Sequence, residues 1–158
     1  MAAKKTNHSQ IIVFTLFILL CASSAQAILS SWQCGNGNYS NTSCWDPLLA
    51  IPPCNYSTVT FDVTIPAGGS TVTMDTGTCE VGSFYLGENR VFRILAGNSY
   101  SVIGQADIYG IIWGDIGDFI APIAAFPGNK ARATAVGGAT VQIGAPYYSS
   151  GGFWKFTN

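Results

Sequence analysis

The sequence predicts an all-β fold, and within that class a solenoid of short strands laid down in successive coils. Charged residues make up only 9% of the 158-residue chain, whereas 18 residues are Gly, a composition that favours strands and turns over long helices. Strand-like runs alternate apolar and polar positions. Similar positions also recur: Val81 and Val102 are 21 residues apart, and Val72 and Ile94 are 22 apart. A β-sandwich is the alternative, since its short strands and hairpin turns fit the pattern loosely.

The first segment, residues 1–27, has the three parts of a secretory signal peptide. Lys4 and Lys5 precede the apolar run Ile11–Ala22, and an Ala-x-Ala exit site ends at Ala27. The run of 12 residues is shorter than the span of about 20 that a membrane helix needs. We therefore expect cleavage, a secreted protein and no membrane span afterwards. A signal anchor that is never cleaved is the alternative.

The second segment, residues 28–56, is irregular and rich in Asn, Ser, Cys and Trp. We expect it to cap the strands, with Trp32 and Trp45 covering apolar ends. Four cysteines follow the signal, and an even number in a secreted chain predicts two disulfides whose pairing the sequence leaves open: Cys34, Cys44, Cys54 and Cys79. Their spacing is not that of a zinc site, so we predict neither a metal nor a cofactor.

Three Asn-x-Ser sequons fall within this cap, at Asn38, Asn41 and Asn55. Their clustering beside cysteines predicts a surface that carries N-linked glycans. The alternative is that a loop rich in Asn and Ser contains such triplets through its composition alone.

The third segment, residues 57–158, contains β-rich runs separated by Gly, Asn or Pro. The predicted strands are Thr58–Ile65, Ser70–Asp75, Val81–Leu86, Arg90–Leu95, Ser99–Ile103, Asp107–Trp113, Ala139–Ile143 and Phe153–Phe156. In the first of these, alternation places Val59, Phe61, Val63 and Ile65 on one face. We also predict that Val72, Ile94 and Val102 point inward.

Three stretches, Val63–Asp75, Val81–Gly87 and Phe92–Gly104, resemble the N-terminal coils of secreted right-handed parallel β-helix proteins of the pectin-lyase-like class. The resemblance covers roughly residues 58–114 and implies a right-handed solenoid. Polysaccharide lyases of that class use acidic residues for calcium and an Arg or Lys as base, but no position here matches that motif. Because family members are longer and the strand pattern runs to Asn158, the segment is interpreted as the beginning of a longer solenoid or as a truncated gene product.

Several kinds of chemistry are excluded by composition. The only histidine, His8, lies in the signal, so the remaining chain has no histidine-dependent nucleophile, general base or metal site. Residues 28–158 hold five basic and eight acidic residues, a net charge of 5 − 8 = −3. Without a basic cluster, a nucleic-acid partner is not expected.

Five residues in the later part of the chain are candidates for ligand binding: Trp113, Asp115, Asp118, Tyr147 and Tyr148. Exposed aromatic rings could stack on sugars, and loop aromatics often mark binding surfaces. The alternatives are that the aromatic rings fill the interior or its ends and that the two aspartates form turns around Gly117.

These observations favour a secreted extracellular module with a structural, adhesive or polysaccharide-binding role, whose partner is an extracellular polysaccharide or a cell-surface component. We identify no catalytic residue and lean against enzymatic activity for this chain alone. One alternative is an N-terminal fragment of a polysaccharide lyase or glycoside hydrolase. Another is a small secreted β-sandwich that acts as a ligand.

Overall fold

The computed structural model describes residues 27–56, 58–115, 117–125, 132–136, 141–146 and 153–156. Within these ranges the regular structure is β-strand except for one short 3-10 helix, η1 (Thr42–Cys44). The all-β prediction is therefore confirmed. The predicted signal peptide lies outside the described residues except for Ala27.

The strands come in three groups along the chain. The cap contains β1 (Ile28–Trp32), β2 (Gly37–Asn38) and β3 (Trp45–Asp46). The middle contains β4 (Phe61–Ile65), β5 (Thr71–Met74), β6 (Thr78–Val81), β7 (Ser83–Leu86), β8 (Val91–Ile94), β9 (Ser99–Val102), β10 (Gln105–Ile108) and β11 (Ile111–Asp115). The last group is β12 (Asp118–Ala125), β13 (Arg132–Val136), β14 (Val141–Pro146) and β15 (Phe153–Phe156).

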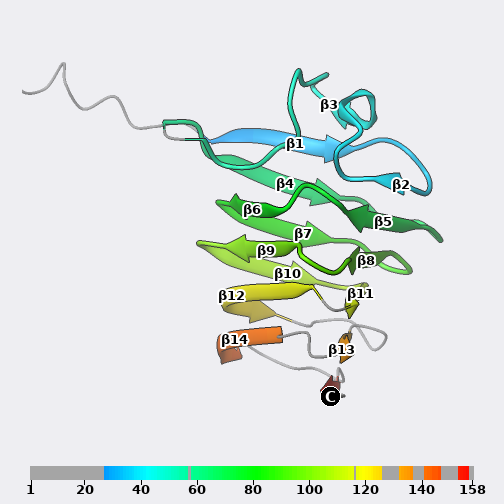
Figure 1. Ribbon diagram of the computed structural model, residues 1–158, viewed down its shortest axis with the longest axis vertical. Coiled ribbons are helices and arrows are strands. Elements are labelled where there is room, and N and C mark those ends of the chain that lie inside the picture. The colour runs from blue at the N-terminus through cyan, green and yellow to red at the C-terminus, as the bar shows by residue number, and fades with distance from the viewer. Residues whose placement is uncertain are drawn as a thin grey trace, which may run out of the picture.

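These strands form two sheets. The nine-stranded sheet has the order β3-β1-β4-β7-β10-β12-β9-β6, with β14 paired to β12, and the six-stranded sheet has the order β15-β13-β11-β8-β5-β2. Figure 1 shows the strands stacked one above another from the cap to the last strand. Among the named strands, only β1 and β3 pair antiparallel, so the hairpin ladders of the alternative β-sandwich are not the pairing found in the described part of the chain.

Each strand from β7 to β11 pairs in parallel with a strand that lies about 20 residues earlier in the chain. In contrast, β4 and β5 pair with the cap strands β1 and β2, which lie further back in the chain. Val81 pairs with Val102, as the repeat predicted. The second predicted equivalence is wrong by two residues, because Val72 pairs with Phe92 and Ile94 pairs with Met74. A shift of two residues keeps the same face of a strand inward, so alternation alone does not distinguish the two registers.

Two predicted strands are each divided by a corner. The run Val81–Leu86 forms the end of β6 and all of β7, separated at Gly82, and the run Asp107–Trp113 spans β10 and β11, separated at Tyr109 and Gly110. At Gly110 a Cβ atom would lie 2.4 Å from the Arg90 carbonyl oxygen. The backbone of this corner therefore packs directly on the backbone of Gly87 and Arg90, which precede β8. Local sequence cannot reveal such a contact.

The interior is filled by the inward positions of all the middle strands. Val72, Ile94 and Val102 are fully buried, which confirms the prediction for these three residues. Val59 was predicted to share the buried face of β4, but it lies before that strand in an isolated bridge with Tyr56 and is 36% exposed. An aromatic cluster occupies the centre of the core and consists of Tyr39, Phe84, Phe92, Tyr100 and Phe119, with neighbouring ring centroids 4.8 to 6.2 Å apart.

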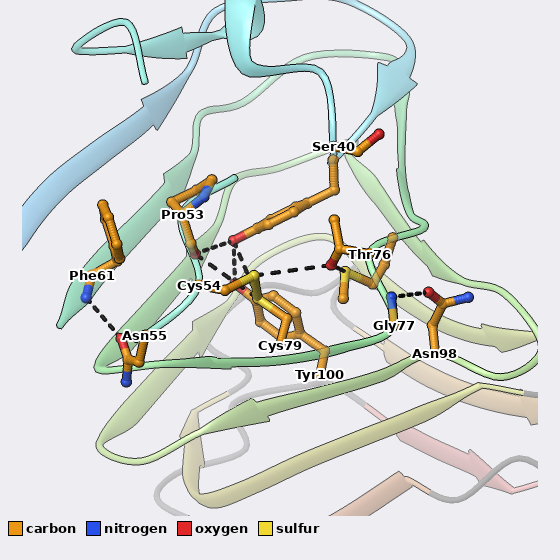
Figure 2. Close-up of a disulfide and its surroundings, with 12 residues drawn as sticks. Ser40, Pro53, Cys54, Asn55, Phe61, Thr76, Gly77, Cys79, Asn98 and Tyr100 are labelled. Atoms are coloured by element: carbon orange, nitrogen blue, oxygen red, sulfur yellow. Dashed lines mark hydrogen bonds between the residues drawn. A yellow bond between two sulfur atoms is a disulfide. The ribbon is translucent and has the colours of Figure 1, made fainter. Parts of the chain in front are cut away.

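Two disulfides hold the cap, so the prediction of two bridges is confirmed. The cap bridge joins Cys34 to Cys44, and the cap-to-sheet bridge joins Cys54 to Cys79 on β6. Figure 2 shows the cap-to-sheet bridge next to Pro53 and Tyr100. There the Tyr39 hydroxyl donates a hydrogen bond to the Pro53 carbonyl oxygen at 2.8 Å and lies 3.3 Å from the Tyr100 hydroxyl.

The two tryptophans of the cap close the upper end of the core, as predicted. Trp32 and Trp45 are buried, and their rings meet edge to face with centroids 5.1 Å apart. Each indole N–H donates to a backbone carbonyl oxygen, that of Trp32 to Gly35 and that of Trp45 to Tyr39. Their polar atoms are therefore satisfied where the rings are buried.

A buried cation joins the cap to the sheets. Arg90 is 7% exposed, and its guanidinium donates to the carbonyl oxygens of Pro66, Gly35 and Cys34 at 2.8, 3.3 and 3.4 Å and to the Ser70 hydroxyl. Burial lowers the pKa of Arg90 from its ordinary value. The acceptors are all neutral oxygens, and two of them belong to the cap loop that the cap bridge closes.

Candidate functional site

The candidate site lies on the outward face of the six-stranded sheet. Alternation along β8 turns Phe92 and Ile94 into the core and leaves Arg93 exposed. On the neighbouring strand β11, Trp113 occupies the position that pairs with Arg93, and its side chain is 43% exposed. On the other side of β8, Thr73 of β5 pairs with Arg93, so Thr73, Arg93 and Trp113 form one row across the three strands. An aromatic ring and a guanidinium therefore stand on adjacent strands, which are about 4.8 Å apart in a sheet.

An ion pair fixes the polar half of this site. Arg93 Nε donates to Asp115 Oδ2 at 3.0 Å, and Nη2 of the same guanidinium also contacts that oxygen. Both side chains are partly exposed, at 45% and 27%. An exposed pair of this kind contributes about 0–1 kcal/mol to folding, so its main effect is to hold the guanidinium and carboxylate beside Trp113.

The structure brings together only part of the predicted ligand-binding set. Trp113 and Asp115 lie on β11, but Asp118 begins β12 in the other sheet, where it pairs with Ser99. The carboxylate of Asp115 is bound by Arg93, which favours an ion-pair role over a turn-forming one. The remaining predicted residues, Tyr147 and Tyr148, lie outside the described residues.

Arg93 is the member of the site that sequence reasoning missed. The sequence did contain an indication of this role. Arg93 occupies an outward position of a predicted strand and lies 20 residues before Trp113, which is the spacing between β8 and β11. Once the register between β8 and β11 is known, Arg93 can be recognised as the neighbour of Trp113.

Two other aspartates have structural partners. Asp75 accepts hydrogen bonds from the backbone N–H and the hydroxyl of Ser40, at 2.9 and 2.7 Å, and so joins the cap to the end of β5. Asp62 accepts from the Ser83 hydroxyl at 2.7 Å between β4 and β7. Neither arrangement places two carboxyl groups on opposite sides of an open site, as glycoside hydrolysis requires.

The three sequons differ in their surroundings. Asn38 and Asn41 are exposed, and the Asn41 side chain accepts from the backbone N–H and the hydroxyl of Ser43 at the start of η1. Asn55 is half-buried, and its Oδ1 accepts from the Phe61 N–H at 2.8 Å. Glycosylation stays a prediction at all three.

The described residues contain no cluster of three or more His, Cys, Asp or Glu side chains placed to hold a metal ion. Within the same ranges no helix has the length and apolar character needed to cross a membrane. In comparisons with known proteins, no family model, curated protein or solved structure matches this chain.

Proposed function

We propose that this chain is a secreted, right-handed parallel β-helix module of the pectin-lyase-like kind that binds extracellular polysaccharide on its six-stranded sheet. Parallel pairing between strands about 20 residues apart supports a helical path. Crossovers between parallel strands of one sheet are right-handed in about 98% of cases. Two disulfides are compatible with an oxidising, extracellular environment.

The observation that carries the binding proposal is the exposed indole of Trp113 beside the Arg93–Asp115 ion pair. The apolar face of a pyranose ring stacks on an aromatic side chain, while its hydroxyl groups require donors and acceptors nearby. The Trp113 indole supplies the stacking surface, and the Arg93 guanidinium and Asp115 carboxylate supply the hydrogen-bond donors and acceptors. The open outer face of a sheet accommodates an extended polymer without a deep pocket.

The experiment measures binding of a cello-oligosaccharide, a soluble xylan and a polygalacturonate to the purified chain by isothermal titration. Covering roughly 100 Å² of indole surface contributes about 2.5 kcal/mol at ~25 cal/mol per Å². We therefore expect Trp113→Ala to weaken binding of the preferred polymer by at least about tenfold, which corresponds to 1.4 kcal/mol.

Leu48→Ala is the matched control, because this apolar side chain is 76% exposed but belongs to the cap. We expect it to leave the dissociation constant unchanged. If Trp113→Ala binds as well as the parent, or if none of the three polymers binds at millimolar sugar concentration, the proposal is wrong.

A further inference from the structure

Charge is divided between the two sheets. In the part of the chain that the structure describes, the strands of the nine-stranded sheet carry five acidic residues and no Lys or Arg. These residues are Asp46, Asp62, Glu80, Asp107 and Asp118. The six-stranded sheet instead carries Arg93, Arg132 and Lys155 with one acidic residue, Asp115. The nine-stranded sheet therefore presents a negative surface, which attracts cations.

A partly exposed aromatic pair lies within this negative surface. Tyr85 on β7 points outward and is 36% exposed. Its ring centroid lies 5.4 Å from that of Tyr109, which follows β10, and the two ring planes are inclined by 45°. The Tyr85 ring is not part of the core, because Phe84 and Leu86 are the residues of β7 that are buried in the interior.

Two carboxylates stand beside the rings. Asp107 pairs in register with Tyr85 on the adjacent strand. Gln105 Nε2 donates a hydrogen bond to Asp107 Oδ1 at 2.6 Å, and Asp107 Oδ2 does not take part in that bond. Glu88 lies in the exposed turn after β7. Partial burial raises the pKa of Tyr85, and the charges of Tyr109, Glu88 and Asp107 raise it further. The rings and carboxylates therefore share one electrostatic environment.

We propose that Tyr85, Tyr109, Asp107 and Glu88, here called the acidic tyrosine patch, bind an arginine side chain of a basic peptide segment on a protein partner. A guanidinium can stack on a tyrosine face while its edge donates a hydrogen bond to a neighbouring carboxylate oxygen, here Asp107 Oδ2. A lysine ammonium is a compact point charge and cannot do both. The surface is distinct from the saccharide site, so this inference stands independently of the proposed function.

The test is fluorescence anisotropy with two labelled peptides of equal length and charge, one alternating Arg with Gly and the other Lys with Gly. We expect the parent protein to bind the arginine peptide at least about fivefold more tightly, because only guanidinium uses ring and carboxylate together. Tyr85→Thr and Asp107→Asn should each weaken that binding by about tenfold. Both side chains lie on the outer face, so melting temperatures should match the parent.

Glu80→Gln is the matched control, since it removes one negative charge from β6 of the same sheet but lies outside the patch. It should change the dissociation constant by less than about twofold. The inference is overturned if Glu80→Gln weakens binding as much as Asp107→Asn, which would indicate diffuse charge attraction. Equal binding of the two peptides, or no binding of the arginine peptide at 1 mM, would overturn it as well.

Discussion

Replacement of Arg90 by methionine tests whether one buried cation holds the cap on the sheets. The change keeps a long side chain in place while it removes every donor of the guanidinium. The carbonyl oxygens of Pro66, Gly35 and Cys34 and the hydroxyl of Ser70 then lose a hydrogen-bond donor. Two of these groups lie in the cap loop, so we expect both lower stability and a looser cap.

The magnitude follows from two opposing contributions. A hydrogen bond from a charged donor contributes about 1.5–3 kcal/mol, and the guanidinium makes four contacts, of which those to Gly35 and Cys34 are long. Burial of the cation costs several kcal/mol, and that cost disappears with the charge. We expect Arg90→Met to lower the free energy of unfolding by about 3 kcal/mol.

The assay is urea unfolding with linear extrapolation, combined with amide hydrogen exchange in residues 33–44. Arg90→Lys is the informative second variant, because lysine keeps the charge but lacks the planar set of donors that reaches the separated carbonyl oxygens. We expect Arg90→Lys to lower the free energy of unfolding nearly as much as Arg90→Met does. A methionine variant as stable as the parent, or complete rescue by lysine, would refute the reasoning.

Three further predictions concern the core, the disulfides and alkaline pH. Val102→Asp places an unpaired charge in the interior and should cost several kcal/mol, whereas Ser101→Asp, its outward neighbour on β9, should cost less than about 1 kcal/mol in thermal or urea unfolding. The cap-to-sheet bridge spans 25 residues and the cap bridge 10. Chain entropy therefore predicts losses of about 3.5 and about 2.7 kcal/mol when each pair is replaced by alanine and unfolding is measured. Burial raises the pKa of Tyr39 and Tyr100 above the ordinary tyrosine value, so the unfolded chain releases these protons first. Stability should hold up to about pH 10 and fall above it, less steeply in Tyr100→Phe, in unfolding measured from about pH 8 to 11.5.

Each of these three has a contradicting result. A folded Val102→Asp variant of parental stability would mean that β9 does not turn this position inward. A larger loss from the cap bridge than from the cap-to-sheet bridge would contradict the loop-length reasoning. Stability that is constant through pH 11.5 would mean that neither tyrosine hydroxyl is shielded from water.

Much of the middle of the fold follows from local pattern. Alternation in the β4 region placed Phe61 and Val63 on one face, Ile94 of β8 was predicted to point inward, and all three are buried. The 21-residue spacing identified the pairing of β6 with β9. The corner at Gly82 was missed because neither Pro nor Asn marks it. A Cβ there would lie 2.7 Å from the Thr60 side chain and 2.8 Å from that of Asp62, and this crowding arises only once β4 and β7 pair.

The binding surfaces were less accessible to sequence reasoning. Trp113 and Asp115 were recognised from their types and proximity, but their partner Arg93 required the register between β8 and β11. The Tyr85–Tyr109 pair likewise joins residues 24 positions apart through strands β7 and β10. Disulfide pairing could not be deduced either, because three pairings of four cysteines satisfy the same sequence.

The most direct test of polysaccharide binding by the six-stranded sheet is a titration of ¹⁵N-labelled protein with the preferred oligosaccharide, followed by two-dimensional NMR. We expect saturable shifts that are largest at the Trp113 indole and extend to the amides of Thr73, Arg93 and Asp115. Shifts that centre on the cap or on the nine-stranded sheet, or spectra unchanged at saturating sugar, would contradict the assignment of this face as the binding surface.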